Sequence, residues 1–153
     1  MQEIPRSVVY GASRPYRLTV LMILTLSLCG VAIAESNLPP IQQSKGVEYV
    51  SGGFGENAAD AFKQAQASFP LSLIFAEDAG GGSRPYVADV HVVIKNPAGA
   101  TVMDVPAAGP YFLAKLEPGK YLLEATYMGN TQKQEIDVTA SKPVHLVLTW
   151  KTT

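Results

Sequence analysis

The sequence has little of the chemistry that cysteine, histidine and arginine provide. One of its 153 residues is cysteine and two are histidine, and Arg84 is the only arginine after residue 17. A single cysteine, Cys29, cannot build a disulfide framework. With one arginine after residue 17, the chain also lacks the guanidinium groups that usually bind phosphates. These shortages exclude a disulfide-stapled scaffold and argue against a nucleic-acid-binding protein.

Excess positive charge is missing as well. Residues 35–153 carry nine lysines and arginines against twelve aspartates and glutamates, a net charge of −3. A weakly acidic chain has no electrostatic attraction to nucleic acid or to anionic lipid. We therefore expect neither as a partner.

The one long uncharged run lies near the N-terminus. Arg14 and Arg17 precede Leu18–Ala34, which has no charged residue and ends in Ala-Ile-Ala. This layout predicts a secretory signal peptide over residues 1–34, and therefore a secreted or periplasmic protein without a membrane segment after cleavage. An uncleaved anchor is the alternative, because about 17 apolar residues is the lower limit for spanning a bilayer. Leu28 before Cys29 argues against lipid attachment, since a small residue is expected there.

The rest of the chain is long enough for one domain with its own core. Pro39-Pro40 keeps residues 35–45 out of a helix, so we expect a flexible leader there. Residues 46–69 predict a short strand candidate, a glycine-rich bend and a helix from Asn57, its N-cap, to about Phe69. The apolar stripe of this helix consists of Ala58, Ala61, Phe62, Ala65 and Phe69.

Residues 70–153 change to the period of two that is typical of strands. In 86–95, Val90, Val92 and Ile94 alternate with polar residues, and turn signals recur every 8 to 12 residues. Pro118 and Gly119 suit the two corners of a type II turn. The pattern predicts a mainly β fold, a seven-stranded antiparallel β-sandwich with one N-terminal helix.

The stretch "LEPGKYLLEATYMG" (116–129) carries a family resemblance. Together with "VHVVIKNPAGATVMDV", it resembles the carboxypeptidase regulatory-like domain, a transthyretin-like β-sandwich, over about residues 70–150. The resemblance implies an accessory module, and no position matches the zinc-peptidase machinery of the enzymes that carry such domains. The matching positions are Leu116, Pro118, Gly119, Tyr121, Leu123, Ala125 and Gly129.

Gly53-x-Gly55-x-x-Ala58 is locally similar to a dinucleotide-binding fingerprint, with Glu77-Asp78 as the acid further on. The fingerprint needs further parallel βαβ units, and the pattern after residue 80 is antiparallel. We therefore interpret these glycines as a bend that lets the helix pack across the end of the sandwich, and we expect no bound cofactor.

Titratable residues give only weak site candidates. Asp89 and His91 lie two apart on one strand face and could share a metal ion, but a zinc site needs three or four ligands. His145 lies on an outward register of another strand. No serine has a nucleophile-elbow sequence, and Glu77 and Asp78 are adjacent on a strand, which points them apart. We expect no metal site and no catalysis.

Recognition is expected in loops, here the bend Gly52–Glu56 and the glycine-rich loop of residues 79–85. Phe54 either staples the bend onto the core, which we favour, or is an exposed anchor. Tyr49, Tyr86 and Tyr111 are candidates for a sugar-stacking platform. We expect a non-enzymatic interaction or accessory module that binds an envelope protein, with a carbohydrate-binding module for a cell-envelope polysaccharide as the alternative. The candidate partner-binding residues are Gly52, Gly53, Phe54, Gly55, Glu56 and Arg84.

Overall fold

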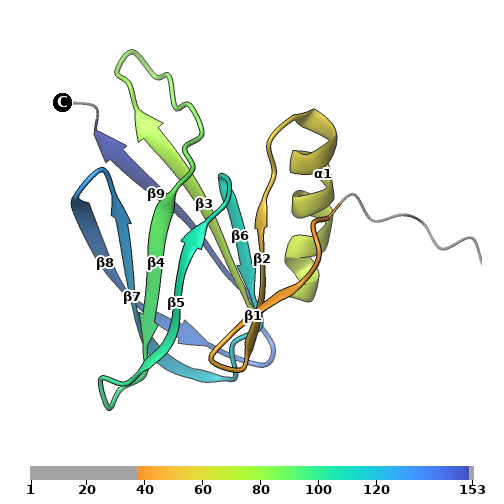
Figure 1. Cartoon of the computed structure of the whole chain (residues 1–153), viewed down its shortest axis with the longest axis vertical. Coiled ribbons are helices and arrows are strands. Elements are labelled where there is room, and N and C mark those ends of the chain that lie inside the picture. The colour runs from red at the N-terminus through yellow and green to blue at the C-terminus, as the bar shows by residue number, and fades with distance from the viewer. Residues whose placement is uncertain (1–37, 152–153) are drawn as a thin grey trace, which may run out of the picture. The chain divides into compact units, whose positions relative to one another are not determined.

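The computed structural model of the chain describes residues 38–151, so the predicted signal peptide lies outside the described residues. The described part is mainly β, with a single α-helix (Figure 1). Its elements are β1 (Gln42–Ser44), β2 (Val47–Gly52), α1 (Glu56–Ala65), a 3-10 turn (Gln66–Ser68), β3 (Leu71–Asp78), β4 (Val90–Lys95), β5 (Thr101–Ala107), β6 (Tyr111–Ala114), β7 (Gly119–Tyr127), β8 (Asn130–Val138) and β9 (Val144–Lys151).

The strands form two sheets that pack face to face, as expected for a β-sandwich. Sheet A has the order β1-β2-β6-β3-β9, and sheet B has the order β5-β4-β7-β8. The expected number of seven strands is wrong, because the described residues contain nine. Strand β2 is the short strand candidate expected within residues 46–69, and it joins the sandwich. Strand β1 was not expected, and Gln42–Ser44 pairs with β2 inside the segment expected to be a flexible leader.

Sheet A is not purely antiparallel, which corrects the second part of the fold prediction. Strand β9 pairs in parallel with β3 along its whole length, from Leu71 opposite Val144 to Asp78 opposite Lys151. Both strands were expected from their local patterns. Their pairing depends on two segments that are distant in the sequence, so local turn signals could not reveal its direction.

The main core lies between the two sheets and follows the alternation read from the sequence. Val90, Val92 and Ile94 are fully buried, whereas His91 between them is exposed. Trp150 on β9 is also buried, and its indole N–H donates a hydrogen bond to the carbonyl of Asn130 at 2.9 Å. The predicted inward faces of these strands are confirmed.

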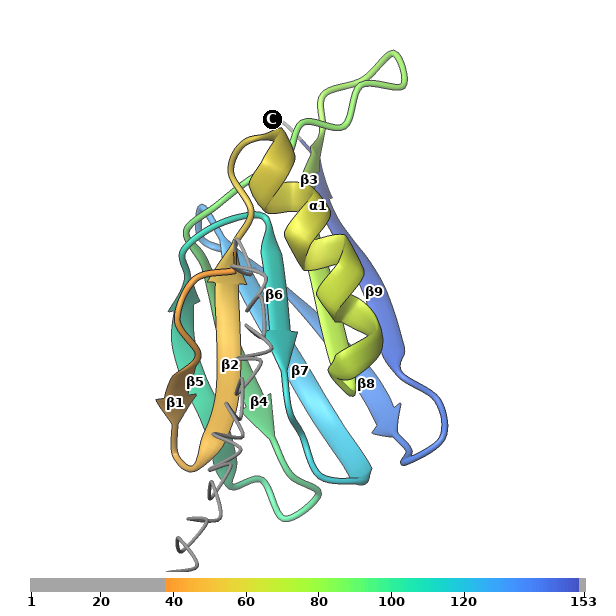
Figure 2. The ribbon, with the colours of Figure 1, turned by 90° about the vertical axis from the view of Figure 1, so that its right-hand side faces the viewer.

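Helix α1 covers the outer face of sheet A, where it connects β2 to β3 (Figures 1 and 2). These two strands run in the same direction on either side of antiparallel β6. Phe62 of the helix is fully buried in a second cluster that includes Val50, Tyr111 and Leu113. The expectation that the helix crosses the end of the sandwich is therefore wrong. Because the helix covers the outer face, all four residues of β6 are buried.

Two local predictions also need correction. The helix N-cap is Gly55, which makes no side-chain capping bond, and Asn57 lies within the helix instead of capping it. Gly119 begins β7 and does not have the positive φ that the second corner of a type II turn requires. The helix therefore begins two residues before the start that an Asn57 cap would give, and β7 begins at the residue expected to be the second corner of the turn.

The sandwich edges are bridged by side chains that bond to backbone groups. On one edge the Gln132 side-chain amide donates to the carbonyl of Thr149 at 2.7 Å, which joins β8 to β9. On the opposite edge the Asp104 N–H donates to the Ser44 hydroxyl at 3.4 Å, which joins β5 to β1. These bridges occupy backbone groups that an open sheet would leave exposed.

Candidate functional site

The two segments predicted to carry recognition lie at the same end of the sandwich (Figures 1 and 2). Gly52 ends β2, residues 53–55 form the bend, and Glu56 begins α1. Arg84 lies in the long connection between β3 and β4, just after the turn of a projecting hairpin. The structure therefore brings Arg84 to the end of the molecule that also carries the glycine bend.

The bend needs glycine at Gly53 for two reasons. Its φ of +91° lies in a region that side-chain-bearing residues rarely adopt, and a Cβ atom at this position would collide with the Tyr111 ring. Gly55 has a similar φ of +86°, but a Cβ atom there would meet nothing within 4 Å. Gly53 thus allows the chain to pass directly over Tyr111 before the helix begins.

Phe54, at the tip of the bend, is 62% exposed. The preferred interpretation as a staple onto the core is therefore wrong, and Phe54 is exposed, as the alternative required. Pro39 and Phe62 lie close to Gly52. Tyr111 then stacks on Phe62, with 5.7 Å between the ring centroids.

Tyr86 is the second exposed aromatic residue at this end, with 55% of its surface accessible. Its ring lies against that of Tyr111 at 5.6 Å between centroids, and the Tyr111 hydroxyl donates to the Tyr86 hydroxyl at 3.3 Å. Burial is the main cause, and this hydrogen bond the second, that raises the pKa of Tyr111 to about 12. The ring contact and the hydrogen bond position Tyr86 against Tyr111.

The predicted sugar platform is not assembled. Tyr49 and Tyr111 are buried, with exposed fractions of 7% and 1%. Tyr86 is the only one of the three that is exposed. Both buried tyrosines belong to strands whose two faces are covered, which the period-two pattern alone did not reveal.

His91 does not join Asp89 in a metal site. Its Nε2 atom lies 2.7 Å from Oδ1 of Asp104 on the neighbouring strand β5, and Asp89 has a φ of +58° before β4 begins. Within residues 38–151, no three His, Cys, Asp or Glu side chains lie close enough together to hold a metal ion. His145 lies exposed on β9, opposite Ser72. Asp104 was not predicted from the sequence as the partner of His91, because only the register between β4 and β5 brings the two side chains together.

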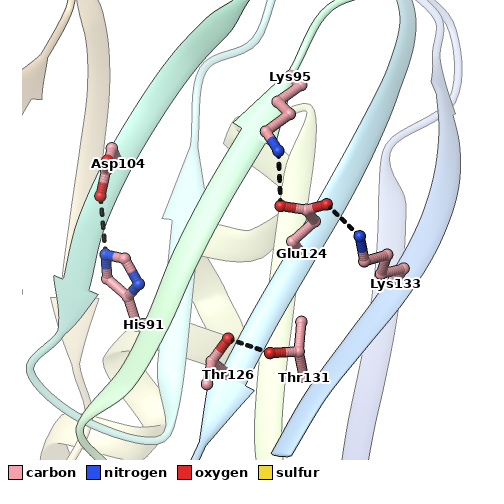
Figure 3. A network of polar contacts seen from close by, with 7 residues as sticks. All are labelled: His91, Lys95, Asp104, Glu124, Thr126, Thr131 and Lys133. Carbon is pink, nitrogen blue, oxygen red and sulfur yellow. Dashed lines mark hydrogen bonds and ion pairs between the residues drawn. The ribbon is translucent and has the colours of Figure 1, made fainter. Parts of the chain in front are cut away.

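The outer face of sheet B carries further polar contacts, drawn in Figure 3. Glu124 accepts hydrogen bonds from Lys133 and Lys95, each at 2.8 Å. These two lysines, with Lys133 contributing most, lower the pKa of Glu124 to about 2. The Thr126 and Thr131 hydroxyls lie 2.7 Å apart. Because its charges are paired, this network favours a structural role over a catalytic one.

Glu77 and Asp78, the acids of the local dinucleotide pattern, end β3. Glu77 lies opposite Trp150 and Asp78 opposite Lys151, so consecutive side chains point to opposite faces. Antiparallel β6 separates β2 from β3, so this βαβ segment does not form the adjacent parallel pair that holds a dinucleotide.

The other end of the sandwich has two open grooves. One, of about 600 Å³, lies between the Asn96–Gly99 turn and residues Lys120, Leu122 and Asp137. The other, of about 550 Å³, lies beside Phe69, Lys115 and Pro143. Neither groove contains a residue singled out as a candidate site from the sequence.

The chain matches no protein-family model, and it matches no curated protein. Within residues 38–151, no helix is long and apolar enough to cross a membrane. The case for function therefore depends on the surface formed by Phe54, Gly55, Glu56, Arg84 and Tyr86, which we call the bend–hairpin surface.

Proposed function

We propose that this protein is a non-enzymatic, secreted or periplasmic interaction module, which binds a protein of the cell envelope through the bend–hairpin surface. The observation that carries the proposal is the exposure of Phe54 and Tyr86 at one end of the sandwich, where Tyr86 lies against the buried ring of Tyr111. Exposed aromatic side chains held in a fixed position are typical anchors of protein interfaces.

The rigidity of the support strengthens this proposal. Phe62, Tyr111 and Tyr86 form a continuous series of ring contacts from the helix core to the surface. A side chain that is already held in place loses less conformational entropy when it is bound. The sandwich architecture is also compatible with the proposed membership of the carboxypeptidase regulatory-like family, whose domains act as accessory modules.

The test is capture of envelope proteins on the immobilised protein, compared between variants. The double variant Phe54→Ser/Tyr86→Ser should lose the captured protein. Val147→Ser is the matched control, because Val147 is 60% exposed but lies in mid-strand on β9, across sheet A from the bend. Equal capture by the wild type, the double variant and the Val147→Ser control would overturn the proposal.

The carbohydrate alternative has less support, because Tyr86 is the only candidate stacking residue that is exposed. A thermal-shift panel of cell-wall fragments and oligosaccharides separates the two functions. A ligand at about 100 times its dissociation constant stabilises the folded state by about 2.7 kcal/mol, which raises the melting temperature measurably. We expect no shift with sugars, and a shift that Tyr86→Ser abolishes would favour the carbohydrate module.

A further inference from the structure

The hairpin that carries Arg84 and Tyr86 has one edge that is paired and one that is not. Residues 83–87 run back along the end of β3, where Ala76 and Tyr86 form an antiparallel bridge. The Glu77 N–H donates to the Pro85 carbonyl at 2.8 Å, and the Val87 N–H donates to the Phe75 carbonyl at 3.1 Å. The peptide groups of residues 85 and 87 are therefore directed toward β3.

Successive residues of a strand direct their peptide groups to opposite sides in the sheet plane. The N–H and C=O groups of Arg84 and Tyr86 must therefore face away from β3. No backbone partner for these four groups is present among residues 38–151. Pro85 does not weaken this free edge, because its missing N–H would have faced β3.

This edge differs from the edges of the two main sheets. Those edges are bridged by Gln132 and Trp150 on one side of the sandwich and by Ser44 on the other. The hairpin instead projects beyond the neighbouring loops (Figure 2), and residues 79–86 are exposed. Unpaired edges of this kind are templates for the addition of another strand.

The side chains around the edge are suited to a peptide partner. Arg84 and Tyr86 are two residues apart and so lie on one face of the hairpin, and both are exposed. Arg84 has no ion pair or hydrogen bond with any residue that the structure describes. A carboxylate opposite it would complete a charge pair, and exposed Phe54 offers an apolar contact at the same end.

We propose that an extended peptide segment of the partner protein adds as a strand to the Arg84–Tyr86 edge. An acidic side chain of the segment lies beside Arg84, and an apolar or aromatic side chain lies against Tyr86 and Phe54. Two N–H donors and two carbonyl acceptors at strand spacing complement a peptide main chain. This inference rests on the proposed function and specifies how its surface binds.

A second copy of this chain is the less suitable occupant. Only three residues of the edge are available, and a stable dimer needs about 1,200 Å² or more of buried surface. Pairing of two such edges with each Arg84 opposite the other would also place like charges together.

The test selects binders from a displayed library of random peptides of about ten residues, using the purified full-length protein as bait. The selected peptide should slow amide hydrogen exchange at Arg84 and Tyr86. N-methylation of its backbone at alternate positions should weaken binding about two- to tenfold for each lost hydrogen bond, whereas methylation at the intervening positions should not. Arg84→Glu should weaken binding, and a lysine in place of the acidic residue of the peptide should restore it.

Three results would overturn strand addition. These are a library that yields no binder, a binder that leaves both amides unprotected, and equal effects of N-methylation at every position. Protection of the two amides without peptide, together with a dimer in sedimentation, would assign the edge to a second copy. If capture of envelope protein still depends on Phe54 in any of these cases, the proposed function stands and only the binding mode fails.

Discussion

The outer faces of the two sheets differ in what covers them. The outer face of sheet A packs against helix α1, and its central residues Val50, Tyr111 and Leu113 are buried. Among residues 38–151, no helix lies over the outer face of sheet B, which carries the ion pairs of Glu124 and the hydrogen bond between His91 and Asp104. Strand β6 of sheet A is buried on both faces and is apolar throughout, whereas β4 of sheet B places exposed His91 between buried Val90 and Val92.

Two leucines test this difference most directly. Leu113 lies on the helix-covered face and is fully buried, whereas Leu122 lies on the outer face of sheet B and is half-buried. Leu113→Ala should lower the free energy of unfolding by about 2–5 kcal/mol, because it leaves a cavity beneath the helix. Leu122→Ala should cost about 1 kcal/mol or less. Urea unfolding of both variants measures the contrast, and equal losses would mean that α1 does not seal sheet A.

The glycines of the bend allow a second, smaller contrast. Gly53→Ala should destabilise the protein by about 1–3 kcal/mol beyond Gly55→Ala, since both positions have positive φ but only Gly53 touches Tyr111. Urea unfolding again gives the difference between the variants. A more stable Gly53→Ala protein would show that Tyr111 can move aside, and that the support beneath Tyr86 is not rigid.

The ion pairs of Glu124 on the outer face of sheet B should make the stability of the protein depend on pH. The folded-state pKa of Glu124 is about 2, below its ordinary value of 4.5. Its contribution to stability is therefore fully present above about pH 4.5 and is lost as the pH falls toward 2. The difference in unfolding free energy between wild type and Glu124→Gln should shrink over this range. A difference that does not change with pH would contradict the assigned lysine contacts.

The exposed pair of His91 and Asp104 should contribute least. Both side chains are about half exposed, so solvent screens their interaction. Asp104→Asn should change the free energy of unfolding by less than about 1 kcal/mol. A larger loss, measured by the same urea titration, would reveal a role for this pair that its geometry does not indicate.

Local patterns in the sequence predicted most of the strands. Val90, Val92 and Ile94 are apolar at every second position because these side chains are buried against the opposite sheet. The placement of α1 and the parallel pairing of β9 were not predictable in this way. Both depend on contacts between segments far apart in the chain, for which period and turn residues carry no information. Strand β1 was missed because Pro39-Pro40 gave a stronger signal for an extended leader than Gln42–Ser44 gave for a strand.

The candidate site was predictable only as a set of loops. Glycines 52, 53 and 55 marked the bend, and the glycine-rich run before Arg84 marked the hairpin. The exposure of Phe54 was not indicated by the glycines on either side of it. The partner of His91 depends on a strand register that shifts between Ile94 and Lys95. Such features require the packed structure.

The parallel pairing of β3 with β9 has a consequence for the order of folding. Five further strands, β4 to β8, lie between Leu71–Asp78 and its partner strand Val144–Lys151 in the sequence. Sheet A therefore cannot be completed until β9 has been made. Contacts over such sequence separations slow folding to about milliseconds to seconds. A chain without Val144–Lys151 would leave this edge of β3 unpaired.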